Sequence, residues 1–167
     1  MPFSVSVRKV ITAVVLAAAF LGAGCAGKQA GLDGGLGAGA GGVATPGSAQ
    51  DFQVNVGDRV FFESDQTSLT QQAVATLDRQ AQWLNQYPRY TFLVEGHADE
   101  RGTREYNLAL GARRAASARD YLISRGISAE RIRTTSYGKE RPVAVCDDIS
   151  CWSQNRRAVT VLDGAGA

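Results

Sequence analysis

A glycine- and alanine-rich stretch near the start of the chain confines any folded core to the residues that follow it. Residues 26–50 contain nine Gly and six Ala with few large apolar side chains, so they cannot bury enough surface to fold. The remaining segment of roughly 110 residues is long enough for one hydrophobic core and too short for two. We therefore expect a flexible tether over residues 25–50, one folded domain over residues 51–163 and a disordered tail over residues 164–167.

The first 24 residues carry the pattern of a secretion signal. Two basic residues, Arg8 and Lys9, precede an apolar run over residues 10–21, and small residues then lead to Cys25. A helix of about twelve residues covers roughly 18 Å, which is short of the ~30 Å hydrocarbon core that a spanning helix must cross. We expect residues 1–24 to act as a cleaved signal peptide.

The small residues before Cys25 resemble a bacterial lipoprotein signal, in which the cysteine is acylated and becomes the mature N-terminus. That signal favours Leu three places before the cysteine, whereas here Gly22 holds that place and Leu21 stands one place earlier. An ordinary cleaved signal with an incidental cysteine is the alternative. Acylation would anchor the protein almost irreversibly, since each buried CH₂ contributes about 0.8 kcal/mol. Ala26 lacks the Asp that enteric-type sorting uses for inner-membrane retention, so we expect the outer membrane.

Composition removes several classes of function. Of the 18 basic residues, Arg8 and Lys9 precede Cys25, which leaves 16 basic and 16 acidic side chains beyond it. A neutral mature protein is a poor nucleic-acid binder. With one His and 8% aromatic residues, the chain offers little for haem or a multi-histidine metal centre, and we expect no cofactor.

Three thiols in an exported protein leave one over after any intramolecular pairing. If Cys25 is lipidated, Cys146 and Cys151 remain as a possible disulfide, five positions apart and joined by a segment that can turn. A metal site at these two cysteines is the alternative, although two thiols and one distant His supply fewer ligands than structural zinc requires.

Apolar periodicity predicts an α+β domain. A first strand is expected to end with Val60, Phe61 and Phe62, and further strands are expected at Tyr90–Gly96, Ile132–Tyr137 and Ala158–Leu162. Helices are expected at Gln71–Gln86 and from Asn107, as N-cap, to about Ser124, where Gly126 ends the helix. A short helical turn is expected near Ser150–Gln154. This order predicts about four strands in a mixed sheet with two main helices packed on one face. We expect Trp83 and Trp152 to pack in the core or at its edge.

The residues best suited to binding lie in the charged loop VEGHADERGTREYN and in the helix after it. Loops that leave strand ends are common binding sites, although a solvated charged turn is the simpler alternative. A helical wheel places Arg114 in the middle of an apolar stripe and turns Arg113 to solvent. A buried guanidinium is costly unless a carboxylate faces it. The partner is either Asp99, in a structural ion pair, or a ligand carboxylate held by two parallel hydrogen bonds.

His97, in the same loop, has two interpretations. A general base needs a nucleophile within reach, and the sequence contains no nucleophile-elbow or papain-type motif. We therefore expect a structural His97 that is hydrogen-bonded to the loop backbone.

Three segments, VEGHADERGTREYNLALGARRA, TSYGKERP and SQNRRAV, are similar to the OmpA-like peptidoglycan-binding domain family, and within it to the peptidoglycan-associated lipoprotein (Pal) family. The resemblance covers about residues 55–163. In that family the bound group is diaminopimelate of the cell-wall stem peptide, whose side-chain end carries an ammonium and a carboxylate on one carbon. The resemblance implies that Asp99 pairs with the ammonium and Arg114 clamps the carboxylate. It implies supporting roles for three further residues, namely Asn107, Arg156 and Asp65.

The same resemblance implies a non-enzymatic outer-membrane lipoprotein that ties the membrane to peptidoglycan within the Tol-Pal system. TolB is the expected periplasmic partner. The expected role is in constriction of the outer membrane during division. One departure concerns the pocket wall, because Phe62 is followed by Glu63 where the family usually has Asp. The alternatives are an envelope cell-wall hydrolase that uses Asp99 or Glu100 as a general acid, and a flagellar-stator-like anchor, which would carry a true spanning helix.

Overall fold

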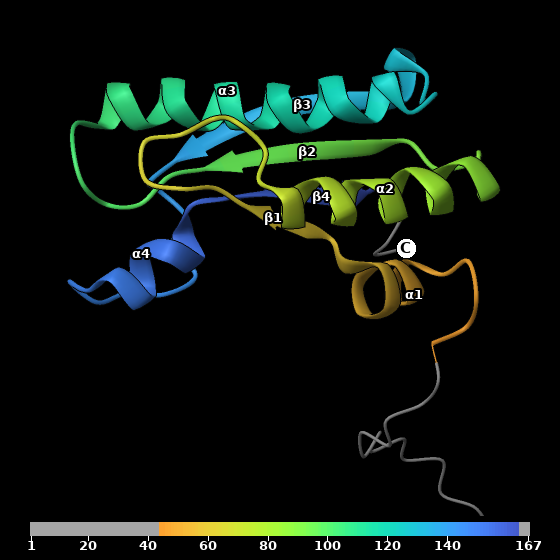
Figure 1. Cartoon of the computed structure of the whole chain (residues 1–167), viewed down its shortest axis with the longest axis horizontal. Helices are drawn as coiled ribbons and strands as arrows, with labels where there is room; N and C mark the ends of the chain where they lie inside the picture. The colour runs from red at the N-terminus through yellow and green to blue at the C-terminus, as the bar shows by residue number, and fades with distance from the viewer. Residues whose placement is uncertain (1–43, 164–167) are drawn as a thin grey trace, which may run out of the picture. The chain divides into compact units, whose positions relative to one another are not determined.

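The structure, a computed structural model, describes residues 44–163 (Figure 1). In chain order the elements are α1 (Ala49–Asp51), the π-helical turn η1 (Phe52–Gly57), β1 (Arg59–Phe61), α2 (Gln71–Gln86), β2 (Phe92–His97), α3 (Arg104–Ser124), the 3₁₀ turn η2 (Ala129–Arg131), β3 (Ile132–Gly138), α4 (Ile149–Asn155) and β4 (Arg157–Leu162). The predicted signal, lipidation site and tail lie outside the described residues. Within the described part, no helix is both long and apolar enough to cross a membrane.

The four strands form one mixed sheet in the order β1-β4-β2-β3. β4 is antiparallel to both β1 and β2, whereas β2 and β3 run parallel. Parallel neighbours need a crossover, and α3 provides it between the end of β2 and the start of β3 (Figure 1). The predicted α+β fold, a four-stranded mixed sheet with α2 and α3 as its main helices, is confirmed.

The core lies between the sheet and its two main helices, because successive side chains of a strand point to opposite faces. Phe92 and Val94 of β2 are fully buried and pack in one cluster with Leu77 of α2 and Leu122 of α3. Glu95, on the opposite face of β2, stays partly exposed. The alternation therefore leaves the second face of the sheet to more polar side chains.

α3 lies against the end of β2 at two facing glycines. A Cβ atom on Gly111 would lie 2.8 Å from the carbonyl oxygen of Gly96 and would overlap the hydroxyl of Ser136. A Cβ atom on Gly96 would overlap the carbonyl oxygen of Gly111. This close approach fixes α3 at the point where the charged loop leaves β2.

The start of α3 differs from the sequence prediction. Thr103 is its N-cap, since the Thr103 hydroxyl accepts from the backbone N–H of Tyr106 at 3.2 Å. Asn107 therefore lies within the first turn of α3, and its predicted capping role is wrong. The predicted bounds of α2 are confirmed, and Gly126 follows α3 with a left-handed φ of 91°, as a helix-ending glycine should.

The packed region begins before residue 51. Ala44 is buried, and the carbonyl of Gly47 accepts hydrogen bonds from Arg89 Nη2 at 2.7 Å and from the Tyr90 hydroxyl at 2.8 Å. Residues 44–50, which composition placed in the tether, therefore pack with the folded domain. Small residues dominate this segment, so it has no apolar periodicity from which its packing against the domain could have been predicted.

Candidate functional site

The loop that follows β2 borders a surface pocket of about 300 Å³. The pocket lies between this loop, the first turns of α3 and the loop that joins β1 to α2. Eight residues line it: Ser64, Asp65, Asp99, Arg101, Gly102, Tyr106, Asn107 and Leu110. Three of the five predicted ligand-binding residues, Asp65, Asp99 and Asn107, are among them, whereas Arg114 and Arg156 are not.

Asp99 is a nearly buried carboxylate at this pocket, with 7% of its surface exposed. Its Oδ2 accepts from Arg101 Nη2 at 2.7 Å and from Arg156 Nη1 at 3.4 Å, and its Oδ1 accepts from Arg101 Nε and backbone N–H, each at 3.3 Å. Burial raises the pKa of Asp99, but the hydrogen bonds and charge of Arg101, aided by Arg156, outweigh it and lower the pKa below its ordinary value. Asp99 is therefore ionised at neutral pH.

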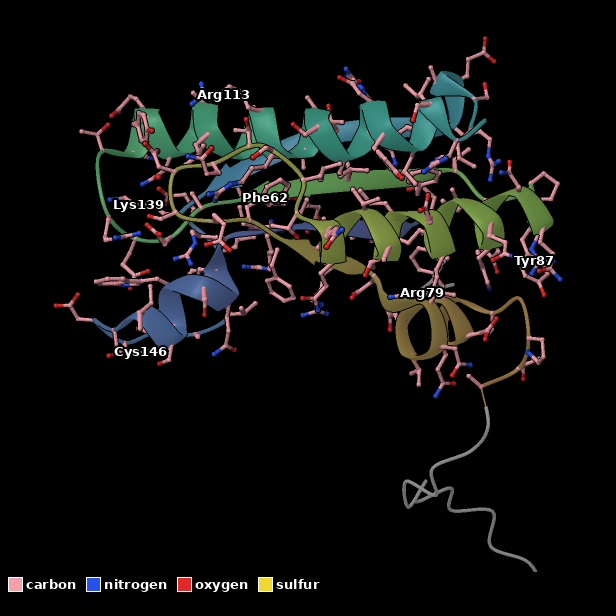
Figure 2. The ribbon with its side chains drawn as sticks, in the orientation of Figure 1. Phe62, Arg79, Tyr87, Arg113, Lys139 and Cys146 are labelled. Carbon is pink, nitrogen blue, oxygen red and sulfur yellow. A yellow bond between two sulfur atoms is a disulfide. The ribbon has the colours of Figure 1, made fainter. Side chains whose placement is uncertain are left out.

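Side chains from two other elements hold the backbone of the Asp99 loop. Asn107 Nδ2 donates to the carbonyl of Arg101 at 2.6 Å. Lys139, which follows β3 and lies beside this loop in Figure 2, donates to the carbonyls of Glu100 at 3.1 Å and Gly102 at 2.7 Å. Gly102 has a left-handed φ of 82°, which glycine adopts at little cost. Asn107 thus supports the pocket by fixing the loop that carries Asp99.

Arg114 is fully buried on the inner side of α3, as its place in the apolar stripe predicts. Its guanidinium donates to three backbone carbonyls: Nε to Gln66 at 2.9 Å, Nη2 to Glu63 at 3.1 Å and Nη1 to His97 at 2.9 Å. The guanidinium carbon also lies 5.3 Å from the ring centre of Phe62. Arg114 therefore ties the loop after β1 to the end of β2.

These carbonyls take the place of the carboxylate that we expected opposite Arg114. Of the two partners considered for Arg114, a structural ion pair with Asp99 is not formed, because Asp99 pairs with Arg101 and Arg156 instead. Burial lowers the pKa of Arg114 to about 10, although the negative charge of Asp99 partly raises it. The guanidinium therefore stays protonated at neutral pH. A guanidinium has five N–H groups, and three of them donate to the carbonyls. Two N–H groups thus remain for a further acceptor.

Arg156 approaches Asp99 from β1's side of the sheet. Its Nε donates to the carbonyl of Phe62 at 3.0 Å, and 5% of its surface is exposed. Together with Phe61 and Glu63, it lines a second groove of about 310 Å³ rather than the Asp99 pocket. Glu63 lines that groove and not the Asp99 pocket, which is lined on this side by the residues that follow it, Ser64 and Asp65.

Asp65 stands at the rim in a left-handed backbone conformation, with a φ of 60°. Asp tolerates this region better than most side chains, because its short polar group hydrogen-bonds locally. Its carboxylate accepts a hydrogen bond from the hydroxyl of Tyr106, which raises the pKa of that phenol. The contact joins the loop after β1 to the first turn of α3 across the pocket.

His97 is buried, with 2% of its surface exposed, but its ring does not bond to the loop backbone as we expected. Neither ring nitrogen has a hydrogen-bond partner among residues 44–163, and Nε2 lies 3.6 Å from a carboxylate oxygen of Glu95. Burial, followed by the positive charges of Arg157 and Arg141, lowers the pKa of His97 to about 4. A neutral imidazole of such low basicity is poorly suited to act as a general base at neutral pH.

Cys146 and Cys151 form a disulfide, with their Cα atoms 5.7 Å apart. The bridge joins the loop before α4 to α4 itself, where Figure 2 shows Cys146. The next residue, Trp152, places its ring centre 4.3 Å from the guanidinium carbon of Arg101, so α4 reaches the rim of the pocket. In the described part of the chain, no group of three or more His, Cys, Asp or Glu side chains gathers in a way that could hold a metal ion.

Comparisons with known proteins show the family of this chain. The OmpA family model matches residues 61–156. The peptidoglycan-associated lipoprotein of Rhizobium meliloti is 72% identical over 87% of this chain and 83% of its own length. This chain belongs to the OmpA family, among the peptidoglycan-associated lipoproteins.

Two solved structures share this fold. The crystal structure of the peptidoglycan-associated lipoprotein from Burkholderia pseudomallei is 43% identical and superposes with a TM-score of 0.61, covering 63% of this chain and 89% of that chain. The C-terminal domain of Helicobacter pylori MotB is 24% identical, with a TM-score of 0.59 over 63% of this chain and 83% of that chain. The second likeness concerns the fold alone.

The family resemblance found Asp65, Asp99 and Asn107 but missed other residues of the pocket. Arg101 lies in the charged loop that the sequence singled out, yet nothing in that loop tells which of its charges faces Asp99. Arg101 Nη2 also donates to the Ser64 hydroxyl at 2.8 Å, across 37 positions of sequence. A contact of that range has no local signature, so it became visible only with the fold.

Proposed function

We propose that this protein is a lipid-anchored outer-membrane lipoprotein that binds peptidoglycan non-covalently and thereby links the outer membrane to the cell wall. Its membership among the peptidoglycan-associated lipoproteins supports this assignment. The observation that carries it is the Asp99 pocket on the protein surface. There a nearly buried, ionised carboxylate lies beside the guanidinium groups of Arg101 and Arg156. Such a site suits a ligand that presents an ammonium group.

The ligand is the diaminopimelate residue of the stem peptide. Asp99 accepts hydrogen bonds from its side-chain ammonium, with Asp65 as a second carboxylate on the same pocket. Arg114 offers its two remaining N–H groups to the carboxylate once the loop after β1 shifts, because a planar guanidinium suits a carboxylate. Asn107 fixes the loop and Arg156 holds Asp99 from behind.

The anchor and the partners belong to the same proposal. Acylation of Cys25 holds the protein in the outer membrane, and the Gly-rich segment that follows it lets the domain reach peptidoglycan in the periplasm. The protein acts in the Tol-Pal system with TolB as a partner and supports constriction of the outer membrane during division.

We propose binding without catalysis. A carboxylate that serves as a general acid in a glycosidase needs a raised pKa, so that it is protonated at the working pH. Asp99 has the opposite shift, because Arg101 and Arg156 stabilise its ionised form. This electrostatic environment favours recognition of a cation over proton donation by Asp99.

Co-sedimentation with purified cell-wall sacculi tests the proposal. We expect the protein to pellet with sacculi and Asp99→Asn to bind at least roughly tenfold more weakly, since a charge-assisted hydrogen bond contributes about 1.5–3 kcal/mol. Asp120→Asn, which removes an exposed carboxylate from the outer side of α3, is the matched control and should bind normally.

The supernatant of the same experiment tests for catalysis. Soluble cell-wall fragments that appear with the protein and disappear with Asp99→Asn would establish a hydrolase instead. Equal pelleting of Asp99→Asn and the unaltered protein would show that peptidoglycan binds elsewhere.

A further inference from the structure

The Cys146–Cys151 disulfide holds the first half of α4, the short helix at the rim of the Asp99 pocket (Figure 2). α4 has seven residues, and a helix of that length is not stable by itself. Its first two residues, Ile149 and Ser150, are exposed and bury little apolar surface. The bridge to Cys151, the third residue, therefore fixes this end of the helix to the loop before it.

A different residue holds the other end of α4. Asn155, the last residue of the helix, is buried, and its Oδ1 accepts from the backbone N–H groups of Val143 at 2.9 Å and Ala144 at 3.2 Å. Its Nδ2 donates to the carbonyl of Ala144 at 2.8 Å. These three hydrogen bonds do not involve the cysteines. Cleavage of the disulfide therefore frees the first half of α4, whereas the base of the loop and the end of the helix stay in place.

The half of α4 that the disulfide holds contains Trp152, which contacts the pocket. The ring centre of Trp152 lies 4.3 Å from the guanidinium carbon of Arg101, and Arg101 Nη2 donates to Asp99 Oδ2 at 2.7 Å. The indole therefore packs on the guanidinium that binds the Asp99 carboxylate. The chain leaves α4 at Arg156, whose Nη1 donates to the same Oδ2 atom at 3.4 Å. Both guanidinium groups on Asp99 thus lie next to α4.

Cys146 is exposed, so a dithiol in solution can reach the disulfide. A thiolate of the dithiol attacks Sγ of Cys146 and forms a mixed disulfide, while the bond to Cys151 breaks and the Cys151 thiolate takes up a proton. The second thiolate of the dithiol attacks the mixed disulfide and releases Cys146, which also takes up a proton. Two electrons pass to the protein, which ends with two thiols, and the reductant ends as a disulfide. The reverse exchange, with a disulfide as oxidant, restores the bridge.

Resting on the proposed peptidoglycan-binding function, we propose that the Cys146–Cys151 bridge is a redox switch for the Asp99 pocket. With the bridge closed, α4 holds Trp152 against Arg101 and the pocket binds the cell wall with full affinity. With the bridge open, Trp152 leaves Arg101, the rim of the pocket loosens and binding weakens. Full affinity therefore requires oxidation of the two thiols by a disulfide donor, a reaction that belongs to an oxidising compartment.

Co-sedimentation with sacculi in two redox states tests the switch. The full chain with Cys25→Ser keeps only this pair of cysteines, dithiothreitol reduces it, and labelling with a maleimide counts the thiols. We expect the reduced form to bind roughly two- to fivefold more weakly, the ratio that corresponds to the loss of one exposed cation–π contact. The double variant Cys146→Ser and Cys151→Ser should bind as weakly as the reduced form, with or without dithiothreitol.

Trp152→Leu tests the route from the disulfide to the pocket. Without the indole on Arg101, this variant should bind sacculi as weakly as the reduced protein, and dithiothreitol should weaken it no further. Ile149→Ala, an exposed change on the same helix, is the matched control and should keep both the affinity and the response to dithiothreitol. Nuclear magnetic resonance gives a second readout that needs no variant. Reduction should shift the indole N–H signal of Trp152 and the backbone amide of Arg101, but not the amide of Val94 in the core.

Three results would overturn the switch while leaving peptidoglycan binding intact. Equal affinity of the oxidised and reduced forms would make the bridge a structural bond only. A response to dithiothreitol that persists in Trp152→Leu would remove the route through Arg101. A shift of the Val94 amide on reduction would show that the disulfide stabilises the whole domain and not the rim alone. Failure of the oxidised protein to pellet with sacculi would instead remove the proposed function, and the switch with it.

Discussion

Arg114 keeps a positive charge inside the fold through backbone carbonyls that belong to two separate segments. The carbonyls of Glu63 and Gln66 lie in the loop after β1, and that of His97 ends β2. A helical wheel could predict that Arg114 is buried, since burial follows from position along the helix. It could not predict these partners, because every residue has a backbone carbonyl and the sequence does not distinguish one carbonyl from another.

Replacement of Arg114 by Lys tests this role. Arg114→Lys keeps the charge but cannot reach three carbonyls in one plane, so we expect the free energy of unfolding to fall by about 2–4 kcal/mol. Urea denaturation measures the change, and sacculi binding should weaken with it as the pocket wall loosens. Arg113→Lys on the exposed side of the same helix should leave both properties within error. Full stability in Arg114→Lys would refute the anchoring role.

The low pKa of His97 predicts that the stability of the protein depends on pH. The chain has one His, so the imidazole signals in a nuclear magnetic resonance spectrum belong to this residue. Its folded pKa is about 4, whereas the ordinary value of 6.5 applies to the unfolded chain. Between these values the unfolded chain binds a proton that the folded protein does not, so stability falls as pH falls through this range. We expect a loss of about 2 kcal/mol between pH 7 and pH 5 that His97→Gln does not show.

The imidazole resonances of His97 check the same prediction directly. They should remain those of the neutral ring down to about pH 5, where an ordinary imidazole is already protonated. A titration midpoint near 6.5 would mean that the ring is solvated and that the predicted loss of stability has another source.

At the scale of elements, the contact between α3 and β2 determines where the pocket forms. The facing backbones of Gly96 and Gly111 allow the helix to approach the strand closely, and the Asp99 loop spans the short distance that remains. α3 then delivers Asn107 to that loop and Arg114 to the loop after β1. One helix therefore organises both walls of the pocket.

Gly111→Ala should disturb this arrangement. The added methyl group would meet the Ser136 hydroxyl and the Gly96 carbonyl, so α3 must shift away from the sheet. We expect a loss of about 1–3 kcal/mol in the free energy of unfolding, the usual cost of overpacking. Ala112→Ser, one position along on the exposed side, controls for changes in helix propensity. An unchanged midpoint in thermal unfolding for Gly111→Ala would show that the contact can relax freely.

The sequence predicted some element boundaries and missed others for physical reasons. The bounds of α2 followed from periodic apolar residues and from Pro88 just beyond its end, and the structure adds Thr70 as its N-cap. The start of α3 was placed late, because Thr103 and Asn107 are both good N-caps and the charged residues between them carry no apolar period. Residues 44–50 were assigned to the tether because a few small residues can pack without any pattern.

The whole protein combines a proposed membrane anchor, a spacer and a binding domain. The composition of residues 26–43 and the family membership of the domain support this arrangement. The strand order β1-β4-β2-β3 places the first and last strands side by side, so Arg156, just before β4, contacts Phe62, just after β1. That topology brings segments from both ends of the domain to the Asp99 pocket, which no local pattern could foretell.

The proposed anchor yields a cellular prediction. Cys25→Ser removes the thiol that would be acylated, so the protein should move from the membrane fraction to the soluble periplasmic fraction. Fractionation followed by immunoblotting measures this distribution. Cys146→Ser, which leaves Cys25 intact, should remain with the membrane, and retention of Cys25→Ser there would indicate another means of attachment.

A titration of isotope-labelled protein with a diaminopimelate tripeptide, followed by nuclear magnetic resonance, tests whether the Asp99 pocket receives the diaminopimelate end of the stem peptide. We predict saturable shifts at the backbone amides of Ser64, Asp99 and Asn107, which border the pocket, and none at Val161 on the opposite face of the sheet. A saturating peptide that leaves the pocket amides unshifted, or shifts others in their place, would show that the stem peptide does not bind in this pocket.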